Sequence, residues 1–76
     1  MNLDDWENNF GHNFLLLRQE HHLTQKQMAE KLNISLYAVQ KIERGTPPLR
    51  LGAYVLINIY LSFGVLSEDM FKDKLG

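Results

Sequence analysis

Residues 23–45 read LTQKQMAEKLNISLYAVQKIERG, and this stretch contains two short helical patterns separated by a tight turn. In the first pattern, Thr24 is followed three residues later by Gln27, which is the spacing of a capping box at a helix start. Asn33 follows the last apolar residue of that pattern, and asparagine tolerates the left-handed conformation that ends many helices. Ser35 is then a suitable cap for a second helix. The stretch therefore predicts two helices joined by a turn.

Apolar residues recur at helical spacing in both patterns and indicate which sides face the core. These inward residues are Met28, Ala29, Leu32, Ala38, Val39 and Ile42. The outward side of the second helix, which is expected to run to Arg44 and to end at Gly45, carries Leu36, Tyr37, Gln40 and Lys41. The major groove of B-DNA is ~12 Å wide and admits one helix. The pattern therefore favours a helix-turn-helix, in which one helix braces and the next presents side chains to base edges.

Upstream, Phe10, Phe14 and Leu17 recur at helical spacing and predict a helix over about residues 9–21. Trp6 lies four residues before Phe10, so the helix can begin earlier. The candidate acidic caps of that longer helix are Asp4 and Asp5.

Downstream, residues 46–48 read Thr-Pro-Pro and predict a loop, because proline cannot continue a helix. Residues 52–63 predict a helix that is apolar on nearly all sides, which is typical of a central helix or of one covered by a partner. Its aromatic residues Tyr54, Tyr60 and Phe63 are expected in the core. A short fifth helix follows from Leu66 or Ser67, and the residues expected to return to the core are Met70, Phe71 and Leu75. The prediction is an all-α fold of five helices.

Composition limits the classes of protein to consider. The chain has 76 residues and no cysteine, which suits one small domain and excludes a disulfide scaffold, a thiolate zinc site and a cysteine nucleophile. Its longest apolar run is shorter than the ~20 residues that span a bilayer. The acidic start differs from the basic start of a signal peptide. We expect a cytoplasmic protein without membrane contact.

Charge is divided unevenly along the chain. The formal net charge is −1, but residues 18–50 carry six basic and three acidic side chains, a net +3. Such asymmetry can indicate a polyanion partner, and it falls on the helix-turn-helix pattern. An ordinary mixed surface remains the alternative interpretation.

The chain resembles the helix-turn-helix domain of the Cro and phage-repressor type, also called the XRE family of bacterial regulators. The resemblance extends from about Phe10 to Phe71, and the residues that carry it are Gly11, Leu17-Arg18, Leu23-Thr24-Gln25, Met28-Ala29, Ser35, Val39, Ile42-Glu43-Arg44-Gly45 and Phe63-Gly64-Val65. It implies a lambda-repressor-like domain over residues 10–76, preceded by an extension of residues 1–9. It also implies a sequence-specific transcriptional regulator that binds double-stranded DNA, as a homodimer and without a cofactor.

The resemblance further implies roles for individual residues. The positions that match base-reading residues are Leu36, Tyr37 and Lys41, with Gln40 as a further contributor. The positions that match phosphate-contacting residues are Gln25, Ser35, Arg44 and, in the loop, Arg50. Arg18 and Glu43 match a pair that forms a buried ion bridge between the first and third helices.

The chain departs from the family at several positions. His22 stands where relatives often have glycine, in the turn after the first helix. Surplus apolar residues on the fourth helix offer a pairing surface for the DNA-binding dimer, for which we expect a seam of Val55, Ile59 and Ser62.

Three features favour a second hypothesis, a protein-interaction module on the same fold, such as an antitoxin-like or accessory regulator with weak or no DNA binding. The net charge is near neutral, and the apolar surface is in surplus. Relatives often carry basic residues in the loop after Gly45, where this chain has two prolines and Arg50 alone.

Other functions have weaker support. His12, His21 and His22 lack the three or four well-placed ligands of a structural metal site, so we expect no metal. There is no nucleophile elbow, no phosphate-binding glycine loop and no motif of paired carboxylates, so we expect no catalysis. Alternatives for the recognition residues stay open: Leu36 and Tyr37 can pack against a partner, and Lys41 and Arg44 can be solvated charges.

Overall fold

In the computed structural model of the chain, the described residues are 6–48, 50 and 52–72. They form five helices and no strand: α1 (Trp6–Glu20), α2 (Gln25–Leu32), α3 (Leu36–Glu43), α4 (Gly52–Phe63) and α5 (Ser67–Met70). The all-α fold is as predicted. The expected caps Asp4 and Asp5 and the expected core residue Leu75 lie outside the described residues.

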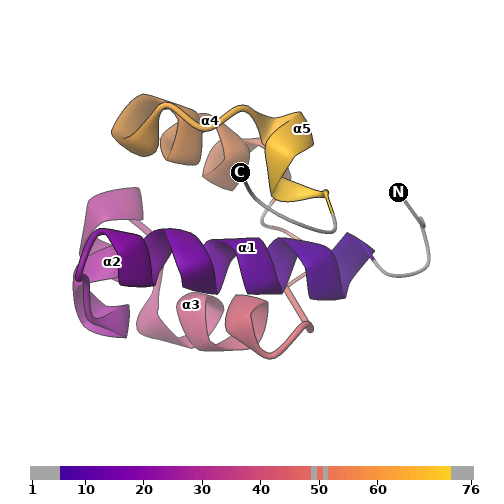
Figure 1. Cartoon of the computed structure of the whole chain (residues 1–76). Helices are drawn as coiled ribbons and strands as arrows, with labels where there is room; N and C mark the ends of the chain where they lie inside the picture. The colour runs from indigo at the N-terminus through magenta and orange to yellow at the C-terminus, as the bar shows by residue number, and fades with distance from the viewer. Residues whose placement is uncertain (1–5, 49, 51, 73–76) are drawn as a thin grey trace.

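Figure 1 shows α1 running through the middle of the molecule, with α3 on one side and α4 with α5 on the other. Contacts follow this arrangement: α3 packs on α1 and α2, α4 packs on α2 and α5, and α5 packs on α1. The core between the helices is apolar and consists largely of Phe10, Phe14, Leu17, Met28, Leu32, Val39, Ile42, Val55, Ile59 and Met70.

The turn between α2 and α3 is fixed by local hydrogen bonds. The Thr24 hydroxyl accepts from the Gln27 amide (3.0 Å), and the Thr24 amide donates to the Gln27 side chain (2.8 Å), which completes the predicted capping box. Asn33 adopts the left-handed conformation (φ 56°, ψ 45°) at the end of α2. The Ser35 hydroxyl accepts from the Ala38 amide (3.0 Å) and caps α3. These contacts confirm the predicted helix ends.

Gly11 explains how α1 and α3 approach closely. It is buried in the middle of α1, and a Cβ at this position would collide with the carbonyl oxygen of Ile42 in α3. A side chain of any size would therefore push the two helices apart. The helix that presents the predicted recognition face is held against α1 at this point.

α4 is attached to the end of α2 by polar side chains. Asn58 donates to the Leu32 carbonyl (3.0 Å), and Asn33 donates to the Tyr54 hydroxyl (2.9 Å). The Asn58 bond satisfies a carbonyl at the C-terminal end of α2, which has no further turn of helix to bond it. The turn of the helix-turn-helix is thus supported from behind by α4.

Two expectations about α4 are wrong. Val55 and Ile59, expected at a pairing seam, are 1% and 0% exposed and belong to the core. Tyr54 and Tyr60, expected in the core, are each about half exposed, at 50% and 49%. A helix that is apolar on nearly all sides gives no periodic contrast, and its sequence therefore does not show which side packs inward.

α5 is held by a buried asparagine of α1. The Asn13 amide nitrogen donates to the carbonyls of Met70 (2.9 Å) and Lys72 (2.9 Å), with a longer contact to that of Asp69 (3.3 Å). Asn13 is fully buried, and its side chain therefore caps the C-terminal end of α5 from a neighbouring helix. Neither this contact nor its partners were predicted.

Candidate nucleic-acid interface

The first turns of α3 bring the four expected base-reading residues onto the surface. Leu36 is 42% exposed and Tyr37 is 64% exposed, while Gln40 and Lys41 are half-buried. The Lys41 ammonium lies 5.8 Å from the centre of the Tyr37 ring, within the range of a cation–π contact. Tyr37 and Lys41 are one helical turn apart, so this contact is a consequence of their i, i+4 spacing. The ring and the ammonium group therefore form one continuous surface.

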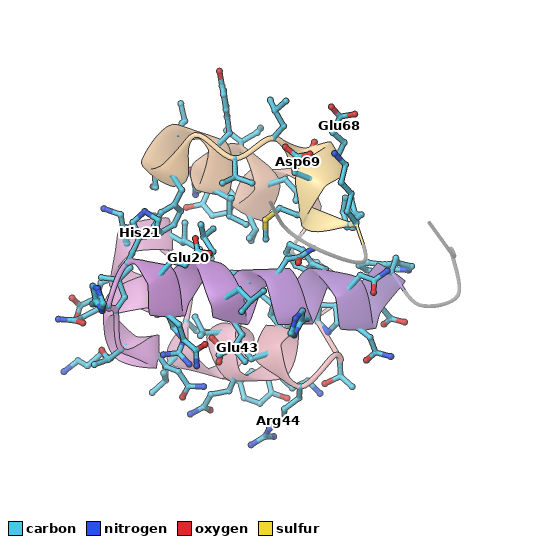
Figure 2. All side chains as sticks on the ribbon, viewed as in Figure 1. Glu20, His21, Glu43, Arg44, Glu68 and Asp69 are labelled. Carbon is cyan, nitrogen blue, oxygen red and sulfur yellow. The ribbon has the colours of Figure 1, made fainter. Side chains whose placement is uncertain are left out.

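The expected phosphate-contacting residues lie around this surface. Ser35 is exposed at the N-terminal end of α3, and its hydroxyl is used as the helix cap. Arg44 is exposed at the other end of the helix. Figure 2 shows it pointing away from the body of the molecule, on the side opposite α4. Arg50 is exposed in the loop that follows.

Gln25, the fourth expected phosphate contact, has a partner within the protein. It lies at the start of α2, is half-buried, and donates from its side chain to the Glu43 carboxylate (3.2 Å). Its position at the first turn of α2 leaves it next to the surface formed by α3. The structure therefore connects Gln25 to the framework of the helix-turn-helix.

That framework is centred on Arg18 and Glu43, the pair expected to form an ion bridge. The guanidinium donates twice to the carboxylate, from Nε (2.7 Å) and from a terminal nitrogen (3.0 Å). Its other terminal nitrogen donates to the Leu23 carbonyl (3.0 Å). The two side chains are only 16% and 8% exposed. Figure 2 shows Glu43 beside α1. One planar guanidinium thus joins α1, the loop after it, and α3.

The loop between α3 and α4 has its own hydrogen bonds. The Lys41 carbonyl accepts from both the amide (3.0 Å) and the hydroxyl (3.3 Å) of Thr46. These bonds close the C-terminal end of α3 and direct the chain into Pro47 and Pro48, both half-buried. Among the described residues of this loop, Arg50 supplies the positive charge.

The described residues contain no group of three or more side chains suited to hold a metal ion. Among these residues there is likewise no helix with the length and hydropathy needed to cross a bilayer. The side chains brought together at α3 are donors and apolar groups that suit a base edge and a phosphate backbone.

These features define a helix-turn-helix DNA-binding domain. The helix-turn-helix family model matches residues 15–56, which is more than half of the chain. The chain therefore belongs to this family, as a DNA-binding transcription regulator of the Cro and phage-repressor type. Neither the curated proteins nor the solved structures contain a match to the chain.

Proposed function

We propose that the chain is a sequence-specific transcriptional regulator that reads the major groove of DNA with α3. The observation that carries this proposal is the exposure of Leu36 and Tyr37 at the start of the helix, with Lys41 beside the Tyr37 ring. A lysine can donate to O6 and N7 of guanine, and apolar side chains can contact the methyl group of thymine. Gln40 extends the same surface and is a further base-reading candidate.

The phosphate contacts in this proposal come from Gln25, Ser35, Arg44 and Arg50. Two of these carry positive charge, so counterion release should be modest, with a log–log salt slope of about −2 per bound copy. The ion pair of Arg18 and Glu43 has a structural role. It holds α3 in the position from which the other residues reach DNA.

We further propose a homodimer that acts in the cytoplasm without a cofactor and without catalytic activity. The half-exposed apolar side chains of α4 support pairing, because exposed apolar surface often marks a protein contact. The functional unit in this proposal is one domain over residues 10–76 preceded by residues 1–9, of which residues 6–9 belong to α1.

Selection of bound sites from random double-stranded DNA tests this proposal. We expect a short enriched motif, and binding of that motif should exceed binding of scrambled DNA by at least 10³-fold, as is typical of specific regulators. A salt titration on the selected site should give the shallow slope stated above. Selection that enriches nothing, together with no binding to mixed DNA at low salt, would contradict the proposal.

That negative result would favour a second function, a protein-interaction module. The half-exposed aromatic and aliphatic side chains of α4 specifically favour this alternative, because exposed apolar surface often marks a protein contact. In that case α3 would still lie on the surface, but the main partner of the chain would be a protein instead of DNA.

A further inference from the structure

The outer face of α4 is an exposed apolar surface, which we define as Ala53, Tyr54, Ile57, Tyr60 and Leu61. Ile57 is 56% exposed and Leu61 is 76% exposed, although both are large aliphatic side chains. No residue of α4 carries a charge. The opposite side of the same helix faces the core through Val55 and Ile59. α4 is thus packed on one side and uncovered on the other.

The exposed residues are arranged nearly symmetrically about Ile57. The two tyrosines lie three residues before and three residues after it, at positions 54 and 60, and are exposed to the same extent. Ala53 and Leu61 lie four residues before and after it. These offsets place all five residues on one side of an α-helix. When two identical helices pack antiparallel across a two-fold axis at Ile57, each tyrosine lies at the height of a tyrosine of the other copy, and each Leu61 lies at the height of a small Ala53.

We propose that the outer face of α4 binds a second copy of this chain, in an antiparallel α4–α4 contact with Ile57 on the two-fold axis. In such an isologous interface, residue i of one copy contacts residue j of the other, and j contacts i. With Ile57 on the axis, this reciprocity pairs position 54 with position 60 and position 53 with position 61, so like residues pair at the tyrosines and a small residue pairs with a large one at Ala53 and Leu61. Because α4 is uncharged, the approach of its own copy meets no like-charge repulsion from this helix.

The shape of the surface agrees with this pairing. A shallow hollow of about 330 Å³ lies along this face, between α4 and the start of α5, and its walls include Ala53, Ile57, Tyr60 and Leu61 of the face together with Leu66. The small side chain of Ala53 leaves room in this part of the surface, whereas Leu61 is the most exposed large apolar side chain of the face. In the antiparallel contact, Leu61 of each copy lies level with Ala53 of the other, so a large side chain meets a small one along this hollow.

The area that the outer face of α4 can bury sets the expected affinity of the dimer. The half-exposed aromatic and aliphatic side chains offer roughly 400–500 Å² per copy, so a pair buries roughly 800–1,000 Å², near the lower limit of specific interfaces. We therefore expect a reversible dimer with a Kd in the micromolar range, on the order of 1–100 μM.

Sedimentation equilibrium of the whole chain without DNA tests this assembly, so its outcome does not depend on the proposed DNA function. The native chain should change from monomer to dimer as its concentration rises through the micromolar range. Ile57→Glu and Ile57→Lys should each weaken the dimer at least tenfold, because identical charges then face each other on the axis. An equimolar mixture of the two variants should dimerise again as a heterodimer.

Gln19→Glu and Gln19→Lys are matched controls on an exposed position of α1, and should leave the dimer unchanged. Circular dichroism and thermal unfolding should show that all four variants retain the fold, since both positions are exposed. A native chain that stays monomeric to 1 mM (on the order of the highest Kd that a specific contact of this size would give) would overturn the proposal. So would Ile57 variants that dimerise like the native chain.

Disulfide cross-linking tests the register, and the absence of native cysteine gives a clean background. Ile57→Cys should oxidise to a covalent dimer, because the two Cβ atoms on the axis come within the ~4 Å that a disulfide requires. Ala53→Cys mixed with Leu61→Cys should give the mixed disulfide in at least fivefold excess over the two symmetric ones. Preferential formation of the symmetric disulfides, or equal cross-linking of a Gln19→Cys control, would overturn the antiparallel contact.

Discussion

Lys41 and Arg44 lie three residues apart near the end of α3, but their surroundings differ. The Lys41 ammonium is beside the Tyr37 ring on the recognition surface, whereas Arg44 is exposed beyond the helix end. A side chain within the groove distinguishes base pairs, and a side chain at the backbone meets the same phosphate in every sequence. The two residues therefore test the two kinds of contact separately.

Lys41→Ala should relax the preference at one base position. We expect discrimination at that position to fall by about 1–3 kcal/mol, while binding of sites already altered there changes little. Arg44→Ala should instead weaken all sites equally and reduce the salt slope by about 1. The measurement is binding to the selected site and to its single-base variants. Equal losses on every variant for Lys41→Ala would rule out its base-reading role.

The ion pair of Arg18 and Glu43 is expected to contribute to the stability of the fold. Glu43→Ala leaves a nearly buried guanidinium without its carboxylate and also removes the acceptor of the Gln25 side chain. We expect the free energy of unfolding to fall by about 3 kcal/mol, at the lower end of the range for broken buried pairs because Arg18 is slightly exposed. Urea unfolding measures this change.

The double variant Arg18→Met with Glu43→Leu is the control for that prediction. It removes both charges and keeps apolar bulk, so it should be more stable than Glu43→Ala alone. A double variant as unstable as the single one would show that the lost hydrogen bonds, from Gln25 in both variants and to the Leu23 carbonyl in the double variant, outweigh the removal of the unpaired charge.

At the scale of elements, the end of α1 carries an unfavourable backbone conformation. His22 has φ 55°, in the left-handed region that glycine adopts more readily than other residues. A side chain with a Cβ costs about 1 kcal/mol in this conformation relative to glycine. His22→Gly should therefore raise the free energy of unfolding by about 0.5–1 kcal/mol, as measured by urea or thermal unfolding.

The neighbouring His21 provides a control of opposite sign. Its ring lies 4.7 Å from that of Phe63 and its Nδ1 is 3.0 Å from the Leu17 carbonyl. Its φ is not positive, so glycine there brings no conformational relief. His21→Gly should destabilise the protein. Stabilisation by both variants would contradict the explanation from backbone conformation.

The Asn13 contact makes α5 dependent on one side chain of α1. In Asn13→Asp, the carboxylate would face the carbonyls of Asp69, Met70 and Lys72 without hydrogens to donate to them. We expect the free energy of unfolding to fall by at least about 2 kcal/mol. Compared with the native protein, the variant should lose hydrogen-exchange protection in α5 and keep it in α2 and α3. Unchanged protection in α5 would contradict the proposed cap.

Sequence patterns predicted the helix-turn-helix well because its ends are encoded locally. Thr24 with Gln27, Asn33 and Ser35 each act within a few residues, and the structure contains each of these caps. Contacts between distant segments were predictable only through family resemblance or not at all. The resemblance paired Arg18 with Glu43, but no local pattern connects Asn13 to the carbonyls of α5.

Which side of α4 faces the core could not be predicted for a different reason. Its sequence gives no polar stripe, so the inward and outward sides differ only in what they pack against. The errors at the predicted seam and at the two tyrosines have this one cause. Once Val55 and Ile59 are placed in the core, Ile57 and its symmetric neighbours must face outward, because an α-helix turns by ~100° per residue.

At the scale of the whole molecule, the two surfaces for which we propose partners face away from each other. Figure 1 shows α3 and α4 on opposite sides of α1. The outer face of α4 points away from the core, and Arg44 at the end of α3 points away on the other side (Figure 2). Tyr54 and Asn58 nevertheless connect α4 to the α2–α3 turn by hydrogen bonds. A dimer through α4 therefore presents its two recognition helices outward, in opposite directions.

This geometry predicts that a dimer joins two DNA duplexes instead of occupying adjacent half-sites on one duplex, which require both helices on the same side, roughly 34 Å apart. With a tethered duplex that carries the selected site, the native protein should capture a second, labelled duplex with the same site. Ile57→Glu should bind the tethered duplex alone and reduce capture of the second at least tenfold. Lys41→Ala should reduce binding of both. Capture that is equally efficient with Ile57→Glu would show that bridging does not depend on α4, and cooperative occupancy of two half-sites on one duplex by the native chain would show that the copies pair through a different surface.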